Sequence, residues 1–243
     1  MYKYRTEYRS ILGDLHTPVS TYLKVRDLFP QSVLMESSDY HGSENNRSFI
    51  GLCPIASVSI SHGEALCKFP DGKEKTTAIS DEYRVDNAIN DFLHEFDVEG
   101  DYSNYCGLYG YTSFNAVRYF EHIPVKDSME AKNDAPDMHY ILYKYIIVFN
   151  DFTSEMVLIE MLKSGENNHL NRIQTAVNST NFALYGFHPV GETTSTLTDD
   201  EHRANIRKGI AHCLRGDVFQ IVLSRRFVQP FTGDDFKLYR ALR

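Results

Sequence analysis

Apolar residues are spaced in two different ways along this chain, and the order of the two spacings restricts the folds it can adopt. Between Ser32 and Phe69 they alternate with polar residues in short runs, as in Ala56-Ser57-Val58-Ser59-Ile60. This two-residue period predicts antiparallel strands and hairpins. The dipeptide Asp71-Gly72 predicts a hairpin turn, because glycine readily adopts positive φ. Further strands are predicted at residues 105–111, 140–150 and 156–162, the last two as a hairpin.

Helical spacing replaces this pattern at residues 85–96, where apolar residues recur three and four positions apart. A weaker helix is predicted at residues 167–178. Strands and helices are thus mixed without a strict β-α-β alternation. The sequence therefore predicts the α+β class.

The best-defined helix is predicted at residues 198–215. Thr198 and Glu201 form a capping box at its start, and Gly216 stands where a helix usually ends. Residues 234–243 also have helical spacing, but no closing Gly, Asn or Pro follows. Because natural helices usually end with such a residue, we expect the chain to be a truncated part of a longer protein.

Composition excludes several classes of function. The formal net charge is −8, whereas nucleic acids and anionic membranes are bound by basic surfaces, so we expect neither as a partner. No apolar run approaches the roughly 20 residues of a membrane span, and no signal-peptide core follows Met1. We therefore expect a cytoplasmic protein. Residues 126–138 are charged and polar and contain Pro136, which predicts a linker or a mobile loop.

A strand is predicted at residues 218–228, directly after the capped helix. Successive side chains of a strand point to opposite faces, so one face is predicted to be apolar and buried. The other face carries Gln220, Val222, Ser224 and Arg226. A buried amide without a hydrogen-bonding partner costs about 1–3 kcal/mol. Gln220 therefore requires a partner, which is either a ligand or, on a half-exposed strand, the solvent.

The segment from Gly216 to Phe227 closely resembles a conserved element of the chorismate-utilising enzymes, most of all the anthranilate synthase component I family. Three other stretches resemble elements of this family in the same order. They are Asp14-Leu15-His16-Thr17-Pro18-Val19-Ser20, Val33-Leu34-Met35-Glu36-Ser37-Ser38 and Arg47-Ser48-Phe49-Ile50-Gly51. The resemblance implies antiparallel β-sheets in a sandwich flanked by helices. It also implies two parts, an amino-terminal region at residues 1–190 and the start of the chorismate-binding catalytic domain at residues 191–243.

The same resemblance implies a reaction. Chorismate and ammonia would give anthranilate and pyruvate, with a glutamine amidotransferase subunit as the source of ammonia. Relatives that activate water carry Lys at the position of Gln220, and a neutral amide cannot act as that base. Val222 favours anthranilate synthase over aminodeoxychorismate synthase component I, which commonly has Asn there and remains the alternative.

The resemblance further implies which residues form sites. Gln220 and Ser224 are candidates for the lining of the chorismate pocket. Glu36, Ser37, Ser38 and Arg47 are candidates for binding tryptophan as a feedback inhibitor. The family binds Mg²⁺ through carboxylates that have no counterpart in these 243 residues, so we expect no metal ligand here and no catalysis by this chain alone. A stand-alone amino-acid-binding regulatory module is a further alternative.

Overall fold

The computed structural model describes residues 1–37, 46–123 and 135–243. Ser38 and most of the expected linker at residues 126–138 lie outside these ranges, and Met138 opens a strand and is buried. The chain divides into two compact units, residues 1–183 and residues 184–243. The expected domain boundary at residue 190 stays a prediction.

The first unit combines strands with helices. Its strands are β1 (Tyr2–Leu12), β2 (Val33–Met35), β3 (Arg47–Ser61), β4 (Glu64–Lys68), β5 (Glu74–Ala78), β6 (Phe96–Glu99), β7 (Leu108–Thr112), β8 (Met138–Asn150) and β9 (Glu155–Leu162). Its α-helices are α1 (Pro18–Val25), α2 (Val85–His94) and α3 (Leu170–Asn178), and its 3-10 helices are η1 (Ser103–Tyr105) and η2 (Phe114–Tyr119).

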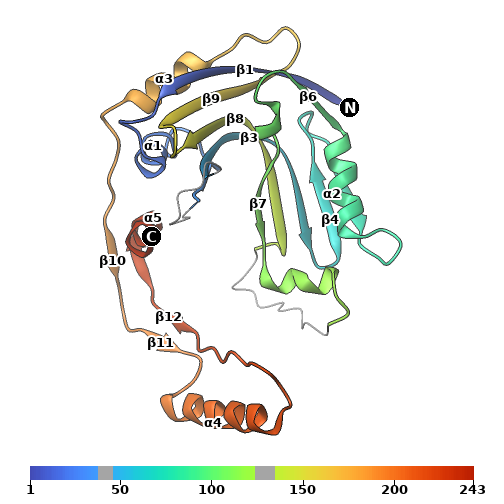
Figure 1. Cartoon of the computed structure of the whole chain (residues 1–243), viewed down its shortest axis with the longest axis vertical. Helices are drawn as coiled ribbons and strands as arrows, with labels where there is room; N and C mark the ends of the chain where they lie inside the picture. The colour runs from blue at the N-terminus through green and yellow to red at the C-terminus, as the bar shows by residue number, and fades with distance from the viewer. Residues whose placement is uncertain (38–45, 124–134) are drawn as a thin grey trace. The chain divides into compact units, whose positions relative to one another are not determined.

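Within the described residues these strands form one nine-stranded sheet in the order β5-β4-β3-β8-β9-β1-β6, with β2 added to β3 and β7 added to β8 (Figure 1). The predicted hairpins form: β4 and β5 pair across Gly72, whose φ is 82°, and β8 pairs with β9. The α+β class is confirmed. The sandwich arrangement stays a prediction.

The long antiparallel pair of β3 and β8 forms the centre of this sheet. Its register runs from Arg47 opposite Asn150 to Ile60 opposite Met138, and it shifts between Pro54 and Ala56. Proline has no N–H to donate to a ladder, and an irregularity of this kind bends and twists a strand. On one side of the bend the pair is flanked by β2 and β9, and on the other side by β4 and β7.

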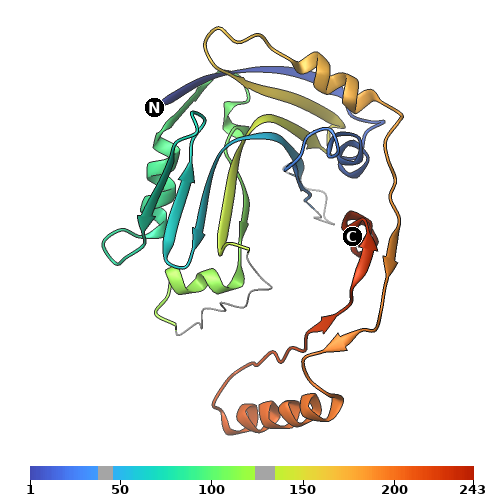
Figure 2. The same cartoon turned by 180° about the vertical axis from the view of Figure 1, so that it is seen from behind.

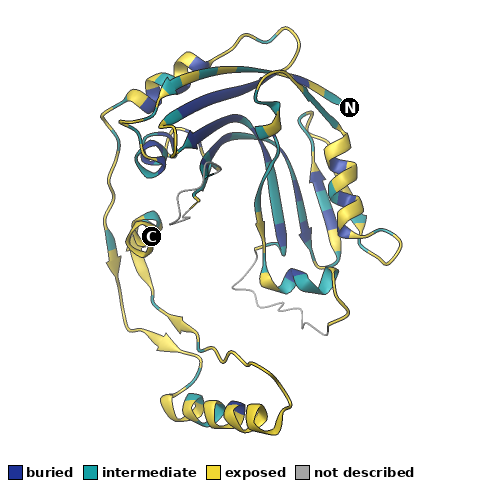
Figure 3. Cartoon of the chain, viewed as in Figure 1, coloured by how far each residue is buried: buried dark blue, intermediate teal, exposed yellow. Residues whose placement is uncertain are grey.

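Helices cover two separate hydrophobic clusters of this unit. The helix α2 buries Val85, Ala88 and Phe92, the apolar face that the helical spacing predicted. The helices α1 and α3 lie together on the other cluster, with Ile50, Leu52 and Leu158 among its buried residues (Figures 1 and 2). The fully buried side chains of β3, β8 and β9 therefore hold the unit together (Figure 3).

The second unit contains short strands and two helices. They are β10 (Phe187–Pro189), β11 (Thr194–Ser195), α4 (Asp199–Arg215), β12 (Phe227–Val228), β13 (Phe231–Gly233) and α5 (Asp235–Leu242). Two ladders join them, β10 with β13 and β11 with β12. The helix α4 begins after the predicted capping box of Thr198 and Glu201, and its C-cap is Gly216 with a φ of 81°.

The strand predicted at residues 218–228 is wrong except for Phe227–Val228. The predicted apolar face is not buried either: Phe219 is fully exposed, and more than half of Phe227 and a large part of Ile221 are exposed. Figure 3 shows the segment between α4 and β12 as mostly exposed. A strand needs a neighbour for its backbone N–H and C=O groups and a layer for its apolar face. Within residues 184–243 the paired neighbour of this segment is the two-residue β11.

Candidate functional site

The segment between α4 and β12 carries Gln220 and Ser224, and it is anchored at its start by Asp217. The Asp217 carboxylate accepts a hydrogen bond of 3.1 Å from Nε of Arg215 and lies 2.8 Å from Nδ1 of His212. Two hydrogen bonds lower the pKa of Asp217, and the bond from Arg215 has a larger effect than the bond with His212. With Gly216 in the left-handed region, these contacts turn the chain sharply away from the helix end.

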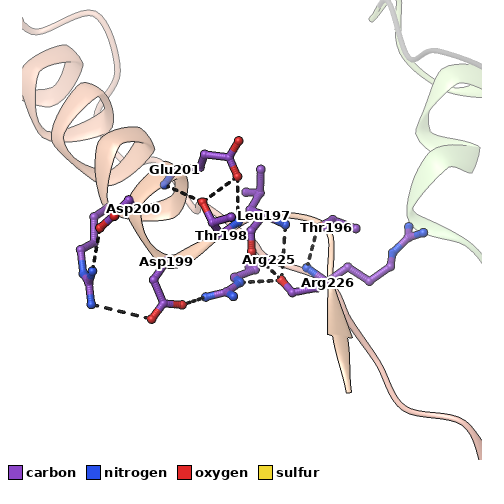
Figure 4. Close-up of polar contacts among 10 residues, drawn as sticks. Thr196, Leu197, Thr198, Asp199, Asp200, Glu201, Arg225 and Arg226 are labelled. Carbon is purple, nitrogen blue, oxygen red and sulfur yellow. Dashed lines mark hydrogen bonds and ion pairs between the residues drawn. The ribbon is translucent and has the colours of Figure 1, made fainter. Parts of the chain in front are cut away.

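Arg225 anchors the other end of the segment to the first turn of α4 (Figure 4). Its Nη1 donates to Oδ1 of Asp199 at 2.5 Å, and its Nε donates to Oγ of Ser195 at 2.6 Å. Its guanidinium also lies 4.6 Å from the centre of the Phe227 ring, so the side chain is only 18% exposed. The hydrogen bond from Arg225 is the main reason that the pKa of Asp199 is lowered.

Between these two anchors, Gln220, Val222 and Ser224 are exposed to solvent. An exposed amide keeps its hydrogen bonds to water, so Gln220 carries no desolvation cost in this chain. The structure therefore holds the segment at both ends and leaves these three side chains accessible. The roles of Gln220 and Ser224 in a chorismate pocket stay predictions.

The residues expected to bind an amino acid meet at one end of the β2–β3 ladder. Met35 lies opposite Phe49 there. The ladder ends at this pair, so Glu36 and Ser37 directly follow its last residue on one strand, and Arg47 and Ser48 directly precede it on the other. An amino-acid zwitterion needs a carboxylate for its ammonium group and donors for its carboxylate. Glu36, Ser37 and Arg47 offer both, although their role stays a prediction, and Ser38 lies outside the described residues.

A groove of about 640 Å³ begins beside the same strand and extends over the bend of the sheet. Its described lining includes three aromatic side chains, Tyr109, Tyr111 and Tyr143. Among all the described lining residues, only Lys68 carries a charge. His139 also lines it, and burial, followed by the nearby charge of Lys68, lowers the pKa of this histidine. The described lining of the groove is thus mostly uncharged, with three tyrosines and a single lysine.

Comparison with known proteins assigns the chain to a family. The sequence profile of the chorismate binding enzymes matches residues 32–243. The chain belongs to the chorismate binding enzyme family. The match includes both the end of the β2–β3 ladder and the segment that carries Gln220.

Relatives of this family are similar along nearly the whole chain. The sequence is 28% identical to anthranilate synthase component 1 of Acinetobacter calcoaceticus, over 97% of this chain and 49% of that protein. It is 25% identical to the protein of the same name from Lactococcus lactis, over 97% of this chain and 51% of that protein. The chain thus spans about half the length of the curated relatives it matches.

A solved structure shares the fold. The crystal structure of anthranilate synthase component I from Streptococcus pneumoniae matches with a TM-score of 0.52 and 21% sequence identity. The match covers 97% of this chain and 52% of that one. Because the identity is low, this likeness supports the fold of the chorismate binding enzyme family and no individual residue role.

Metal binding receives no support from the described part of this family member. Among those residues, no group of three His, Cys, Asp or Glu side chains is placed to hold a metal ion. The Mg²⁺ that the family resemblance implies for a longer protein stays a prediction. In the same part of the chain, no helix is long and apolar enough to cross a membrane.

Sequence patterns did not indicate several contacts that shape these sites. Arg225 and Asp199 are far apart in sequence, and only the fold brings them together. The same is true of Tyr143, whose hydroxyl donates to the backbone of Gln31. Glu160 could have been noticed, because it is an acidic residue in the otherwise apolar run of residues 156–162.

Proposed function

We propose that this chain forms the amino-terminal half of an anthranilate synthase component I, which converts chorismate and ammonia to anthranilate and pyruvate. The observation that carries the proposal is the family match over residues 32–243, which includes the segment with Gln220. The names of the relatives support the choice of reaction. Residues that the relatives carry beyond the matched part would supply the rest of the active site.

The chemistry of Gln220 supports ammonia as the nucleophile. A lysine acting as a base toward water would need its pKa lowered by about 3 units, which requires roughly 4 kcal/mol from its surroundings. A carboxamide cannot take up that proton, whereas ammonia brings its own lone pair. Val222 supports anthranilate over aminodeoxychorismate as the product, and aminodeoxychorismate synthase component I remains the second candidate.

Product formation tests this proposal. The chain is fused to the remaining half of the Acinetobacter calcoaceticus relative and supplied with chorismate, an ammonium salt and Mg²⁺. We expect anthranilate fluorescence from the fusion and none from the chain alone. In the fusion, Gln220→Lys is expected to lower the rate, while Val222→Ile, at another exposed position of the same segment, retains it. A folded fusion without product would contradict the proposal, and aminodeoxychorismate as the product would establish the second candidate.

We also infer that a glutamine amidotransferase subunit supplies the ammonia and that the protein works in the cytoplasm.

We further infer that Glu36, Ser37 and Arg47 bind tryptophan as a feedback inhibitor. The acidic and basic groups at the end of the β2–β3 ladder support this inference. Calorimetric titration with tryptophan tests it, and Glu36→Gln is expected to weaken binding. Tryptophan binding without any turnover by the fusion would favour a stand-alone regulatory module.

A further inference from the structure

We propose that two phenols, those of Tyr22 and Tyr143, are positioning groups for the amino-acid site, because together they fix the start of β2, the strand that leads directly into Glu36 and Ser37. The inference rests on the regulatory site of the proposed function. It adds two residues that do not touch the ligand and whose effect on affinity passes through β2.

The two phenols hold adjacent backbone carbonyls. The hydroxyl of Tyr143, on β8, donates to the carbonyl oxygen of Gln31 at 3.1 Å. The hydroxyl of Tyr22, on α1, donates to the carbonyl oxygen of Ser32 at 3.3 Å. Two different elements of the first unit thus hold the two residues that come directly before β2.

The first of these two anchored residues has an unusual backbone conformation. Gln31 has a φ of 59°, in the left-handed region that few residues other than glycine adopt. Such a conformation persists only where the surrounding structure determines it. The bond from Tyr143 is made to the carbonyl group of this same residue, so it helps to maintain the turn that directs the chain into β2.

The strand β2 depends on this anchor because it is short. Among the described strands it pairs with β3 alone, over Val33 to Met35. Glu36 and Ser37 follow at once, and a strand advances about 3.3 Å per residue without internal hydrogen bonds of its own. A displacement of the turn at Gln31 is therefore expected to move both residues of the amino-acid site.

Gly51 makes room for the Tyr143 ring beneath this ladder. It lies opposite Val33, and a Cβ atom at this position would lie 2.5 Å from Cδ2 of Tyr143. Tyr143 is only 2% exposed, and burial, followed by the nearby Tyr22 phenol, raises its pKa to about 12. The hydroxyl therefore remains a hydrogen-bond donor throughout the neutral pH range.

Removing single hydroxyl groups tests the inference. Tyr143→Phe and Tyr22→Phe are compared with the matched control Tyr109→Phe, which removes another phenol that donates to a backbone carbonyl, that of Tyr105 at 2.6 Å. Tryptophan affinity is measured by calorimetry on the chain and on the fusion. Amide hydrogen exchange of residues 33–37 is measured on the chain without ligand.

We expect Tyr143→Phe to weaken tryptophan binding about fivefold and Tyr22→Phe about threefold, with residues 33–37 exchanging faster in both. Tyr109→Phe is expected to lower the urea midpoint by a similar amount without either effect. Affinity and exchange unchanged in both variants would overturn the positioning role alone. Absence of tryptophan binding by the wild-type fusion would overturn the regulatory site itself. Exchange at residues 33–37, which is measured without ligand, would then still show whether the two phenols fix β2.

Discussion

The carboxylate of Glu160, which is fully buried, lies 3.8 Å from the ammonium group of Lys144 on the neighbouring strand. The backbone N–H of His169 donates to the same carboxylate at 2.6 Å. Lys144 also forms an ion pair of 3.1 Å with Glu166 in the loop before α3. A buried carboxylate is tolerated only where it is paired and hydrogen-bonded. This group therefore ties β8, β9 and the start of α3 together.

Lys144→Met is expected to destabilise the chain by roughly 1–3 kcal/mol, because it leaves the Glu160 charge buried with less compensation. The double variant Lys144→Met with Glu160→Gln is expected to recover part of this loss, since the buried charge is then gone. Urea unfolding of the two single variants and the double variant gives the coupling energy. Glu166→Gln, which removes the more exposed partner of Lys144, serves as the control. A double variant that is less stable than Lys144→Met would contradict the expectation.

Gly51→Ala is expected to lower the free energy of unfolding by about 1–3 kcal/mol, because its methyl group would overlap the ring of Tyr143. The matched control is Gly107→Ala, where an added Cβ meets no atom within 4 Å. Denaturant unfolding of both variants measures the difference. Equal stability of the two would show that the Tyr143 ring moves aside without cost.

His139 is expected to make the chain less stable as the pH falls. Burial, followed by the charge of Lys68, lowers its pKa in the folded state below the ordinary value of 6.5. The unfolded chain then binds the proton more readily than the folded chain does. The contribution of His139 to stability is therefore fully present above about pH 6.5 and is lost as the pH falls from there toward the folded pKa.

Unfolding free energies of the wild type and His139→Gln, measured from about pH 7.5 to 5.5, test this sign. The variant is expected to lose less stability over that interval. Lys68→Gln, which removes the second cause, is expected to lie between the two. A parallel decrease in the wild type and in His139→Gln would assign the pH dependence to other groups.

Arg225→Met is expected to release the segment that carries Gln220, because it removes the bonds to Asp199 and Ser195. Amide hydrogen exchange of residues 217–226 should become faster while the helix α4 retains its protection. The neighbouring variant Arg226→Met is a matched control, since Arg226 bonds to Thr196 through its backbone N–H and C=O. Similar exchange in the two variants would contradict an anchoring role for Arg225.

Local signals were sufficient to predict many elements. The helical period predicted α2, the capping box and Gly216 predicted the two ends of α4, and Asp71-Gly72 predicted the hairpin of β4 and β5. Each of these elements is determined by residues that are close together in sequence. The α+β class followed from their order.

Patterns that depend on distant partners were predicted less well. The alternation at residues 218–228 has strand character, but a strand requires a paired neighbour, which only Phe227 and Val228 have here. The pairing of Lys144 with Glu160 depends on the register of β8 against β9, which no short pattern specifies. The contact between Tyr143 and Gln31 likewise requires the complete sheet.

The bend at Pro54 has a consequence for how the first unit unfolds. Because β3 and β8 remain paired on both sides of it, the outer strands on either side are attached to one shared ladder. Neither half of the sheet can separate from this ladder without exposing backbone N–H and C=O groups of the other half. We therefore expect residues 1–183 to melt in a single cooperative transition rather than in successive stages.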